Sequence, residues 1–327
     1  MIKVTAAVFE CDDMIMAARR ANGKHLAGFW EFPGGKLEQG ETEEECLARE
    51  LFEEFGVEVV VGDFVTDSRH DYGDVSILLL AYKVQLVSGS FTLRDHDEIC
   101  WLPITRLREL EWAPADLPVI HALEAEYSAL QTVSYYDDHP QAYFDETLNN
   151  DMSVLRDRFL AEVSPSGRIL DLGCGSGRDS KFFLDRGFDV VPMDASEPLA
   201  KLAQNYLGCH VQVSNYQELS GKACFDGIWA CASLLHCPEH QIYSVFSRCV
   251  DALRSRGVFY FSFKSGVSPR VDSRGRFFND YTLTKAKNLI ARFSELTVID
   301  VWEEEKPLRG ANQYWINGLV RKCDEAL

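Results

Sequence analysis

The chain has 327 residues, a formal net charge of −18 and ten cysteines. This length is enough for two domains of ordinary size, and the apolar and charged fractions are those of a globular protein. The acidic charge is concentrated in residues 1–128, which carry 11 Lys and Arg against 25 Asp and Glu. Such a charge argues against long-range attraction to DNA, RNA or anionic membranes.

No feature of the sequence indicates export or membrane insertion. The first ten residues lack the apolar core and small-residue cleavage site of a secretory signal. The longest apolar run, residues 77–82, is too short to span a bilayer. The cysteines form no Cys-x-x-Cys pair and no zinc-spaced cluster with histidine. We therefore expect a cytoplasmic protein with reduced cysteines.

The first part of the chain predicts a mostly β domain with two helices. A hairpin is expected around Asp12-Asp13, because residues on both sides favour strands. Further elements are expected in this order: strands near 59–70 and 74–85, a short strand after Asp95, and a helix at about 117–129.

Residues 42–56 predict the helix around which this domain is organised. Thr42 is a suitable N-cap, Glu45 completes a capping box, and Gly56 suits the position after the last turn. One face carries an apolar stripe that must meet a core. A second face carries three carboxylates within one turn, namely Glu50, Glu53 and Glu54.

Three neighbouring carboxylates repel one another unless positive charge lies among them. Arg49, one turn before Glu53, is placed to hold one of them. A divalent cation accounts for the others, because Mg²⁺ binds through a few carboxylates together with substrate phosphates. The alternative is a solvated acidic helix face, which the specific spacing disfavours.

This spacing resembles the Nudix box, in which glycine, glutamate and an Arg-Glu-aliphatic-x-Glu-Glu-x-Gly-aliphatic run follow at fixed intervals. All nine positions are met, by Gly35, Glu41, Arg49, Glu50, Leu51, Glu53, Glu54, Gly56 and Val57. The resemblance implies a Nudix hydrolase domain over residues 1–130, an α/β/α sandwich with a mixed sheet. It also implies Mg²⁺ or Mn²⁺ held by Gly35, Glu50, Glu53 and Glu54, with these glutamates serving catalysis.

The domain is most similar to the MutT-like subgroup that includes (d)CTP pyrophosphohydrolases, on the strength of the run from Trp30 to Glu38. This resemblance implies that Arg20 contacts the phosphate chain and that Phe32 helps to wall the base pocket. A further metal carboxylate is expected from Glu98, with Asp95 as the alternative. The alternative for Arg20 is a surface arginine at the end of a strand.

Asp116 matches the place where this family reads the base. Oxidised-guanine hydrolases carry Asn there and cytidine-type enzymes carry Asp, whose carboxylate can accept the amino proton of cytosine. Asp116 also suits the N-cap of the helix that follows. We expect hydrolysis of a nucleoside triphosphate to monophosphate and pyrophosphate, with a cytosine-type or modified base favoured. The rival interpretation is a nucleotide sensor that does not hydrolyse and regulates the rest of the chain.

A boundary is expected near residues 135–140, and a second domain over residues 134–327. After a helix at about 151–163, a buried strand runs from Arg168 into a glycine turn ending at Gly177. Arg178 replaces the third glycine of the dinucleotide fingerprint, so NAD is disfavoured. Asp194 ends the next strand, where an acid can accept both ribose hydroxyls.

These features resemble the class I S-adenosylmethionine-dependent methyltransferases, with a Rossmann-like, doubly wound, seven-stranded sheet. The fold class of the whole chain is then α/β and α+β in two domains. The resemblance implies that a set of residues around the glycine turn binds S-adenosylmethionine: Tyr136, Asp171, Gly173, Cys174, Gly175, Gly177, Asp194, Ala195, Asn215, Tyr216 and Ala230. Asn215 stands where many of these enzymes carry Asp beside the adenine.

The methyl acceptor is less readable from the sequence. His236 is a candidate base, with a strand-end histidine as the alternative. Lys264 begins a loop to Arg276 that holds four cations against one acid, which suits a phosphate or carboxylate of the acceptor. The run after Asp226 lacks the motif of amino-methylating DNA enzymes, so DNA is not expected. A small molecule or nucleotide is favoured, and RNA is the alternative.

Overall fold

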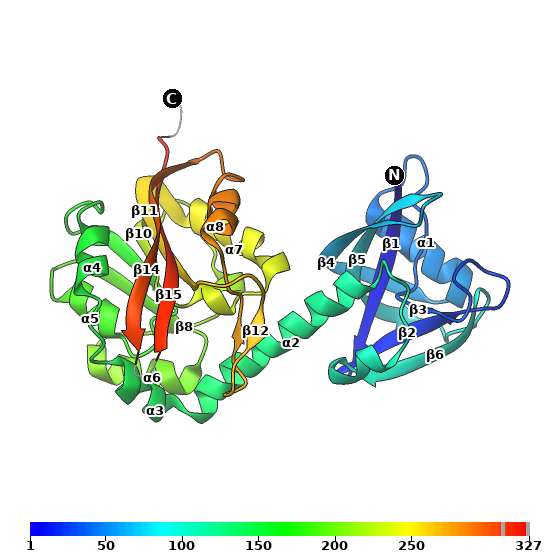
Figure 1. The fold of residues 1–327 in the computed structure, drawn as a ribbon, viewed down its shortest axis with the longest axis horizontal. Helices are drawn as coiled ribbons and strands as arrows, with labels where there is room; N and C mark the ends of the chain where they lie inside the picture. The colour runs from blue at the N-terminus through cyan, green and yellow to red at the C-terminus, as the bar shows by residue number, and fades with distance from the viewer. Residues whose placement is uncertain (309–310, 325–327) are drawn as a thin grey trace. The chain divides into compact units, whose positions relative to one another are not determined.

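The computed structural model describes residues 1–308 and 311–324. The chain forms two compact units, Met1–Tyr127 and Ser128–Leu327 (Figure 1). Within the described residues, no helix is long and apolar enough to cross a bilayer.

The first unit is built on a six-stranded mixed sheet. β1 pairs in parallel with β5 and antiparallel with β2, in the order β3-β2-β1-β5-β4, and β6 pairs with β2. Its elements are β1 (Ile2–Cys11), β2 (Met14–Arg20), β3 (Trp30–Glu31), α1 (Glu43–Phe55), β4 (Glu58–Asp71), β5 (Ser76–Ser88), β6 (His96–Pro103), a 3₁₀ turn (Ile104–Glu109) and the start of α2 (Leu117–Asp138).

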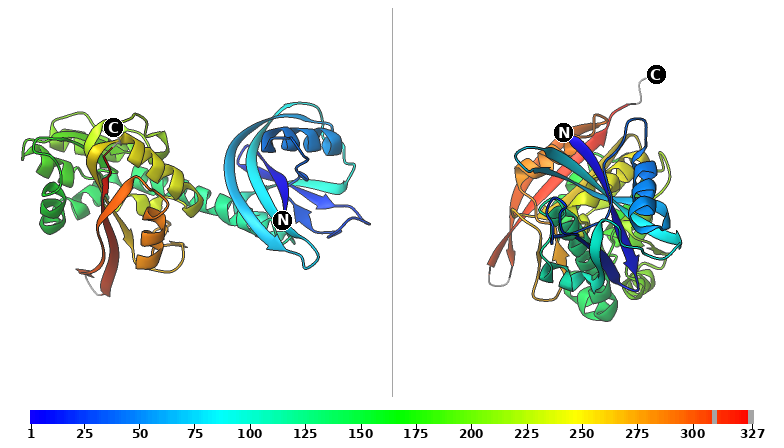
Figure 2. Two further views of the ribbon diagram at one scale, coloured as in Figure 1. Left: turned by 90° about the horizontal axis from the view of Figure 1, so that it is seen from above. Right: turned by 90° about the vertical axis from the view of Figure 1, so that its right-hand side faces the viewer.

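Both faces of this sheet are covered, because strand side chains alternate between two cores. Along β1, Ala6 and Val8 lie in the core with α2, whereas Ala7 and Phe9 lie in the core with α1. Figure 2 shows α1 against the curved strands β4 and β5. The α/β/α sandwich with a mixed sheet predicted from the sequence is therefore confirmed.

The expected end of the second helix near residue 129 is wrong. α2 continues to Asp138, and the division between the units falls within it. Polar contacts hold this extension: the buried Thr132 hydroxyl donates to the Ser128 carbonyl and accepts the Phe277 N–H, at 2.9 and 2.8 Å. The periodicity of apolar residues does not reveal such polar contacts, and the sequence therefore predicts an end of the helix that is too early.

The second unit is a doubly wound α/β fold. Its elements are α3 (Pro140–Thr147), α4 (Ser153–Leu160), β7 (Arg168–Leu172), α5 (Arg178–Leu184), β8 (Asp189–Asp194), α6 (Glu197–Leu207), β9 (Gln212–Val213), a 3₁₀ turn η2 (Tyr216–Glu218), β10 (Phe225–Ala230), a 3₁₀ turn η3 (Leu234–His236), α7 (Glu239–Ala252), β11 (Leu253–Lys264), β12 (Arg270–Val271), β13 (Phe277–Phe278), α8 (Leu283–Ile290), β14 (Leu296–Leu308) and β15 (Ala311–Lys322).

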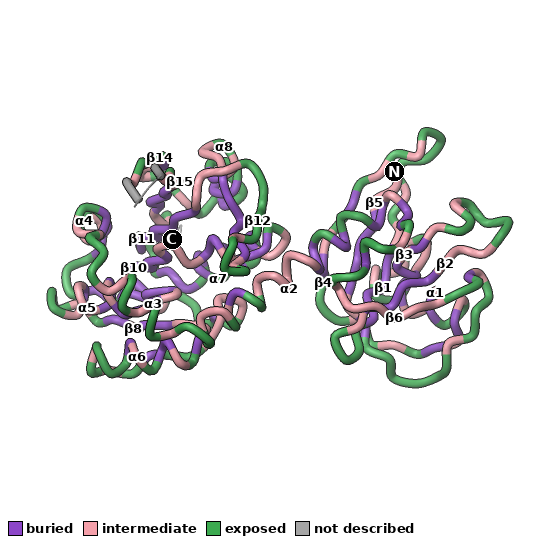
Figure 3. The backbone as a smooth tube through the Cα atoms, turned by 60° about the horizontal axis from the view of Figure 1, so that its bottom comes forward, coloured by how far each residue is buried: buried purple, intermediate pink, exposed green. Residues whose placement is uncertain are grey.

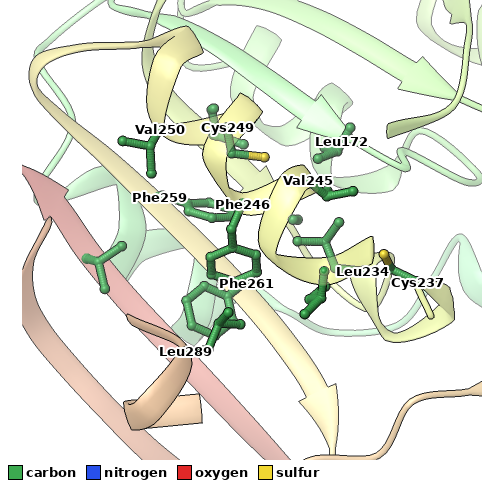
Figure 4. Packing of buried hydrophobic residues seen from close by; sticks show 14 of the residues in the cluster. Leu172, Leu234, Cys237, Val245, Phe246, Cys249, Val250, Phe259, Phe261 and Leu289 are labelled. Carbon is green, nitrogen blue, oxygen red and sulfur yellow. The ribbon is translucent and has the colours of Figure 1, made fainter. Parts of the chain in front are cut away.

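Seven of these strands form one sheet in the order β14-β15-β11-β10-β7-β8-β9, in which β15 runs antiparallel to both of its neighbours, β11 and β14. Ile169 and Trp229 face a core with α4 and α5, and Leu170 and Ile228 face a core with α7 and α8. Figure 3 shows the sheet strands largely buried, and Figure 4 shows Phe246 of α7 among the phenylalanines of β11. The predicted Rossmann-like sheet is confirmed.

Candidate active sites

Helix α1 has the caps that its sequence predicts. The Thr42 side chain accepts the Glu45 N–H at 3.2 Å, the Glu45 carboxylate accepts the Thr42 N–H at 2.9 Å, and Gly56 adopts a left-handed φ of 68°. Leu47, Leu51 and Phe55 form the apolar stripe of the helix and are fully buried against the sheet. The acidic face of the helix is therefore fixed in orientation.

Arg49 organises the acidic face. Its guanidinium donates to Glu41 at 2.6 Å, to Glu50 at 3.0 Å and to Glu53 at 3.3 Å. The hydrogen bond from Arg49 is the main reason that the pKa of Glu41 falls to about 2. Arg49 thus compensates three carboxylates, and Glu54 is left to other partners.

Glu54 and Glu50 line a cavity of about 600 Å³ in the first unit. Burial, followed by the nearby charges of Glu31, Glu50 and Asp95, raises the pKa of Glu54 to about 8. Among the described residues, neither Glu54 Oε2 nor Arg20 Nε has a hydrogen-bond partner although both are buried. A buried polar atom without a partner is costly, so this cavity is built to receive a polar ligand.

Gly35 brings backbone and carboxylate into close approach. A Cβ atom there would lie 2.1 Å from the Glu50 carboxyl carbon, so any side chain would displace Glu50. The Gly35 carbonyl accepts the Thr5 N–H at 2.8 Å and the Thr5 hydroxyl at 3.3 Å.

The donor set suits a hard divalent cation. Glu50, Glu54 and Asp95 line one cavity and offer carboxylate oxygens, the ligands that Mg²⁺ and Mn²⁺ prefer. The described residues contain no group of three or more Asp, Glu, His or Cys already close enough to enclose a metal ion. The residues therefore fit a cation that is completed by ligands from a substrate.

The structure brings most of the expected first-unit residues together. Around the cavity lie Arg20, Phe32, Gly35, Glu50, Glu54 and Asp116. Glu53 lies outside it with its side chain 59% exposed, and Glu98 also lies outside, paired with Arg19 at 2.8 Å. Of the two carboxylates weighed for the additional metal ligand, Asp95 is the one in the cavity.

Two cavity residues were missed by the sequence reasoning. His96 is buried, stacks on Phe55 and shares a 2.8 Å hydrogen bond with Glu31, which also pairs with Arg20. The Asp95-His96 pair directly before β6 was a possible signal for His96. Glu31 stood within the resembling run but was given no role.

Asp116 is buried and lines the same cavity next to Phe32. One of its oxygens accepts the Phe32 N–H at 2.9 Å, and the Phe32 ring lies 4.7 Å from the Trp112 ring. Burial and the nearby Glu31 hold the pKa of Asp116 well above its usual range. Its backbone carbonyl accepts the N–H groups of Val119 and Ile120, so Asp116 also begins α2.

The second unit has a smaller cavity, of about 100 Å³, at the C-terminal edge of its parallel strands. Gly173, Gly175 and Gly177 all have positive φ, and a Cβ at Gly173 would lie 2.4 Å from that of Ser233. The Asp194 carboxylate accepts the Gly175 N–H at 2.8 Å and thereby fixes the turn beside the cavity.

The expected cofactor residues divide between the cavity wall and its support. On the wall lie Tyr136, Gly173, Gly175, Asp194, Ala195, Asn215 and Tyr216, together with His236. The lining does not include the other expected cofactor residues, Asp171, Cys174, Gly177 and Ala230, or the expected acceptor ligand Lys264 at the end of β11. Asp171 accepts the Ser180 hydroxyl at 2.6 Å, and burial raises its pKa to about 7. Ala230 is fully buried in the core.

Asn215 has a structural task as well. Its side-chain oxygen accepts the Glu218 N–H at 3.1 Å and caps the turn η2. One lone pair of that oxygen is therefore committed, and the other remains for a ligand.

His236 and Tyr136 meet at one wall of this cavity. The Tyr136 hydroxyl lies 2.9 Å from His236 Nε2, and His236 Nδ1 lies 2.6 Å from the Phe277 carbonyl. Burial, reinforced by the charges of Arg276 and Lys264, lowers the pKa of His236 to about 4. The imidazole is therefore neutral at physiological pH.

The basic loop is largely neutralised. Arg270 pairs with Asp280, Arg276 with Asp272 and Arg274 with Glu146. Lys264 differs, because its ammonium lies 3.9 Å from the centre of the Phe278 ring and has no ion pair among the described residues. Burial and the neighbouring arginines lower the pKa of Lys264 to about 8.

Comparison with known proteins finds the NUDIX domain at residues 1–123 and a methyltransferase domain at residues 169–257. A putative 8-oxo-dGTP diphosphatase 2 of Mycobacterium tuberculosis (strain CDC 1551 / Oshkosh) is 45% identical, over 31% of this chain and 73% of its own length. The CTP pyrophosphohydrolase of Escherichia coli (strain K12) is 36% identical, over 38% of this chain and 93% of its own length.

Among solved structures, a Burkholderia thailandensis 1,6-didemethyltoxoflavin-N1-methyltransferase is 26% identical and covers 61% of this chain and 90% of its own, with a TM-score of 0.49. The chain belongs to the NUDIX family through its first unit and carries a methyltransferase domain in its second. It therefore combines a Nudix hydrolase with a methyltransferase.

The raised pKa of Glu54 predicts a pH-dependent loss of stability in the protein treated with EDTA. The folded state keeps a proton on Glu54 up to about pH 8, whereas the unfolded chain releases it near the ordinary glutamate pKa. Stability therefore falls as pH rises between these values. Glu54→Gln removes this loss, and its melting temperature in EDTA at about pH 9 exceeds that of the wild type.

Differential scanning fluorimetry across pH checks this prediction. Glu44→Gln, an exposed position on the same helix, is the matched control and leaves the wild-type pH profile unchanged. A Glu54→Gln protein that is less stable than the wild type at high pH would contradict it.

Proposed function

We propose that the first unit hydrolyses a nucleoside triphosphate to the monophosphate and pyrophosphate with the help of Mg²⁺ or Mn²⁺. The observation that carries the proposal is the pair of buried atoms without partners, Glu54 Oε2 and Arg20 Nε, which line the same cavity. One belongs to a carboxyl group that can give up its proton to bind a metal ion, and the other belongs to a cation that suits a phosphate.

In this proposal Glu50, Glu54 and Asp95 hold the cation. When bound, the cation polarises phosphoryl oxygens and helps to ionise the attacking water. Arg49 keeps the Glu50 carboxylate in place by its 3.0 Å hydrogen bond. Arg20 binds the phosphate chain, and Glu31 orients Arg20 by pairing with it. Glu53 accepts a hydrogen bond from Arg49 at the rim of the acidic face. It contributes negative charge and binds the cation through a water molecule.

Asp116 is proposed to read the base. The relatives of this chain include proteins named for 8-oxo-dGTP and for CTP. With the Phe32 N–H on one oxygen, the second oxygen is available to a base edge. A carboxylate there accepts the exocyclic amino proton of cytosine, whereas a carboxylic acid donates to a carbonyl. Because the pKa of Asp116 is raised, an amino-bearing base would favour its ionised form and a carbonyl-bearing base its protonated form. We favour a cytosine-type base, as the family resemblance implies, and retain oxidised bases as the alternative.

Glu54→Gln and Glu50→Gln test the hydrolase. Each removes a negative ligand at the reacting phosphate, so kcat/KM for nucleoside triphosphates falls by about 100-fold or more. The measurement is chromatographic detection of monophosphate and pyrophosphate from a nucleotide panel with Mg²⁺. Glu44→Gln is the control. If the wild type yields no monophosphate from any nucleotide, the hydrolase proposal fails.

Asp116→Asn tests the base reading. Asparagine can keep an oxygen for the Phe32 N–H and then presents a donor where the second carboxylate oxygen stood. The ratio of kcat/KM for CTP to that for 8-oxo-dGTP therefore falls about 10-fold to 100-fold. An unchanged ratio in steady-state assays on the full-length protein would remove Asp116 from base selection.

We further propose that the second unit binds S-adenosylmethionine in its cavity and methylates a small molecule or nucleotide. When bound, S-adenosylmethionine supplies an electrophilic methyl group. The Gly173–Gly177 turn gives the backbone close access to it, Asp194 accepts the ribose hydroxyls, and Asn215 faces the base. Lys264 is proposed to receive an anionic group of the acceptor. RNA is less favoured, because the loop arginines already have acidic partners.

Asp194→Ala tests the cofactor assignment. The substitution removes the acceptor for the ribose and also the 2.8 Å support of the Gly175 N–H. Affinity for S-adenosylhomocysteine, measured by isothermal titration calorimetry, falls about 10-fold to 100-fold. Asp189→Ala, an exposed position on the same strand, keeps wild-type affinity. Equal affinity in Asp194→Ala and the wild type would contradict the role of Asp194.

A further inference from the structure

A chain of three groups crosses one wall of the second cavity. Tyr136 comes from the C-terminal part of α2, His236 from η3 and Phe277 from β13. The Tyr136 hydroxyl, the imidazole of His236 and the Phe277 carbonyl follow one another at 2.9 and 2.6 Å. The arrangement joins segments 100 residues apart in sequence at a position next to the glycine turn.

The hydrogen bonds fix which nitrogen of His236 carries the proton. A carbonyl oxygen can only accept, so Nδ1 must be protonated and donate to Phe277. The imidazole is neutral, so Nε2 bears a lone pair. The Tyr136 hydroxyl must then donate to Nε2. The Arg276 side chain also interacts with the Tyr136 hydroxyl, so one lone pair of Tyr136 Oη is left for a group in the cavity.

The charges around His236 come from several elements. Arg276 and Lys264 oppose its protonation and Asp272 favours it. The Tyr216 hydroxyl donates to the His236 backbone carbonyl at 3.3 Å, and the Phe278 ring packs 4.9 Å from the imidazole. The site therefore holds a neutral histidine whose unprotonated nitrogen accepts a hydrogen bond from a tyrosine that also lines the cavity.

The same wall also carries a polar atom without a hydrogen-bond partner in the described part of the chain, the hydroxyl oxygen of Ser233. The Ser233 hydroxyl is buried and has no hydrogen-bond partner among the described residues, although Ser233 lines the cavity. Ala232 before it has a positive φ of 55°, a conformation that non-glycine residues adopt at a cost. The loop after β10 is thus shaped so that polar groups, rather than apolar ones, meet a ligand.

We propose that Tyr136 and His236 form a proton relay that removes the proton of a protic N–H or O–H acceptor as it is methylated. The relay rests on the proposed methyltransferase function of this unit and adds Tyr136 as a catalytic residue of that reaction. Tyr136 touches the acceptor, and His236 takes the proton from Tyr136.

The step balances in atoms and charge. The acceptor nitrogen or oxygen bonds to the methyl carbon, and the carbon–sulfur bond breaks with its electron pair staying on sulfur. The acceptor proton passes to Tyr136 Oη while the Tyr136 proton passes to His236 Nε2. Tyrosine ends neutral and His236 ends as an imidazolium. One positive charge leaves sulfur and one appears on imidazole, so the charge of the cavity is unchanged.

The low basicity of His236 narrows the class of acceptor. Its pKa of about 4 makes it a poor base for a protonated aliphatic amine. It suits an amide-like or heteroaromatic N–H, or a hydroxyl, because these groups become strongly acidic once they carry the extra methyl group. The His236 imidazolium then releases its proton to water through the same tyrosine.

Nuclear magnetic resonance of the full-length protein labelled with ¹⁵N-histidine tests the relay without any cofactor. The His236 signal, identified with His236→Gln, shows the neutral Nδ1–H tautomer down to about pH 5. In Tyr136→Phe, the Nε2 resonance moves toward that of an imidazole nitrogen without a hydrogen bond. A proton on Nε2 in the wild type would overturn the relay.

Methyl transfer gives the second readout, with labelled S-adenosylmethionine and a deproteinised small-molecule extract as the probe. Tyr136→Phe lowers the initial rate about 10-fold to 100-fold and makes it rise more steeply with pH, because water must then take the proton. His236→Gln keeps an oxygen to accept from Tyr136 but cannot take a proton, so it loses activity equally. Tyr135→Phe, one residue away on α2, keeps the wild-type rate.

S-adenosylhomocysteine titrations separate the two claims. Both relay variants retain affinity within about threefold of the wild type, because Tyr136→Phe keeps the ring on the cavity wall and removes only its hydroxyl, and His236 is not among the expected cofactor residues. Wild-type rate and pH profile in both variants would overturn the relay and leave the methyltransferase standing. No binding by the wild type would overturn the proposed function and the relay with it.

Discussion

The structure of the first unit depends on how it compensates crowded negative charge. Arg49 compensates the negative charge of Glu41, Glu50 and Glu53 by donating a hydrogen bond to each. Glu54 is excluded from this arrangement and lies buried near three other carboxylates, which raises its pKa. Such a position costs stability and persists where function requires it. In the proposed function, a metal ion supplies the missing positive charge, and a polyphosphate supplies the ligands that complete the coordination of the metal.

The second unit differs from the first in the charge that its cavity presents to a ligand. Apart from Asp194, its cavity wall carries neutral groups, which include glycines, tyrosines and an uncharged histidine, and most loop cations are paired with acids. A wall of this kind suits a ligand that brings its own positive charge. The first unit leaves an anion for its ligand to neutralise, whereas the second leaves a neutral proton acceptor.

The sequence predicts the parts of this molecule that depend on local period and spacing. Helix period places Glu50 and Glu54 on one face, and the caps at Thr42 and Gly56 define the helix. The structure agrees on both points. Both fold classes follow from such patterns, because buried strands and glycine turns occur at readable intervals.

The remaining features depend on register and on contacts between distant segments. Glu98 lies within β6, whose pairing with β2 sets it opposite Arg19, whereas Asp95 directly precedes β6 and lines the cavity. This difference depends on where the strand begins and on its register. The end of α2 depends on Thr132 and its bond to Phe277, 145 residues away. The contact between Tyr136 and His236 spans 100 residues and has no local signature.

Anomalous diffraction from crystals soaked with Mn²⁺ and a non-hydrolysable nucleoside triphosphate tests the central claim most directly. The account predicts a manganese peak within bonding distance of Glu54 Oε2, shared with Glu50, and a phosphate oxygen at the Arg20 guanidinium. Manganese confined to the exposed glutamates at the start of α1, with no nucleotide in the cavity, would contradict it.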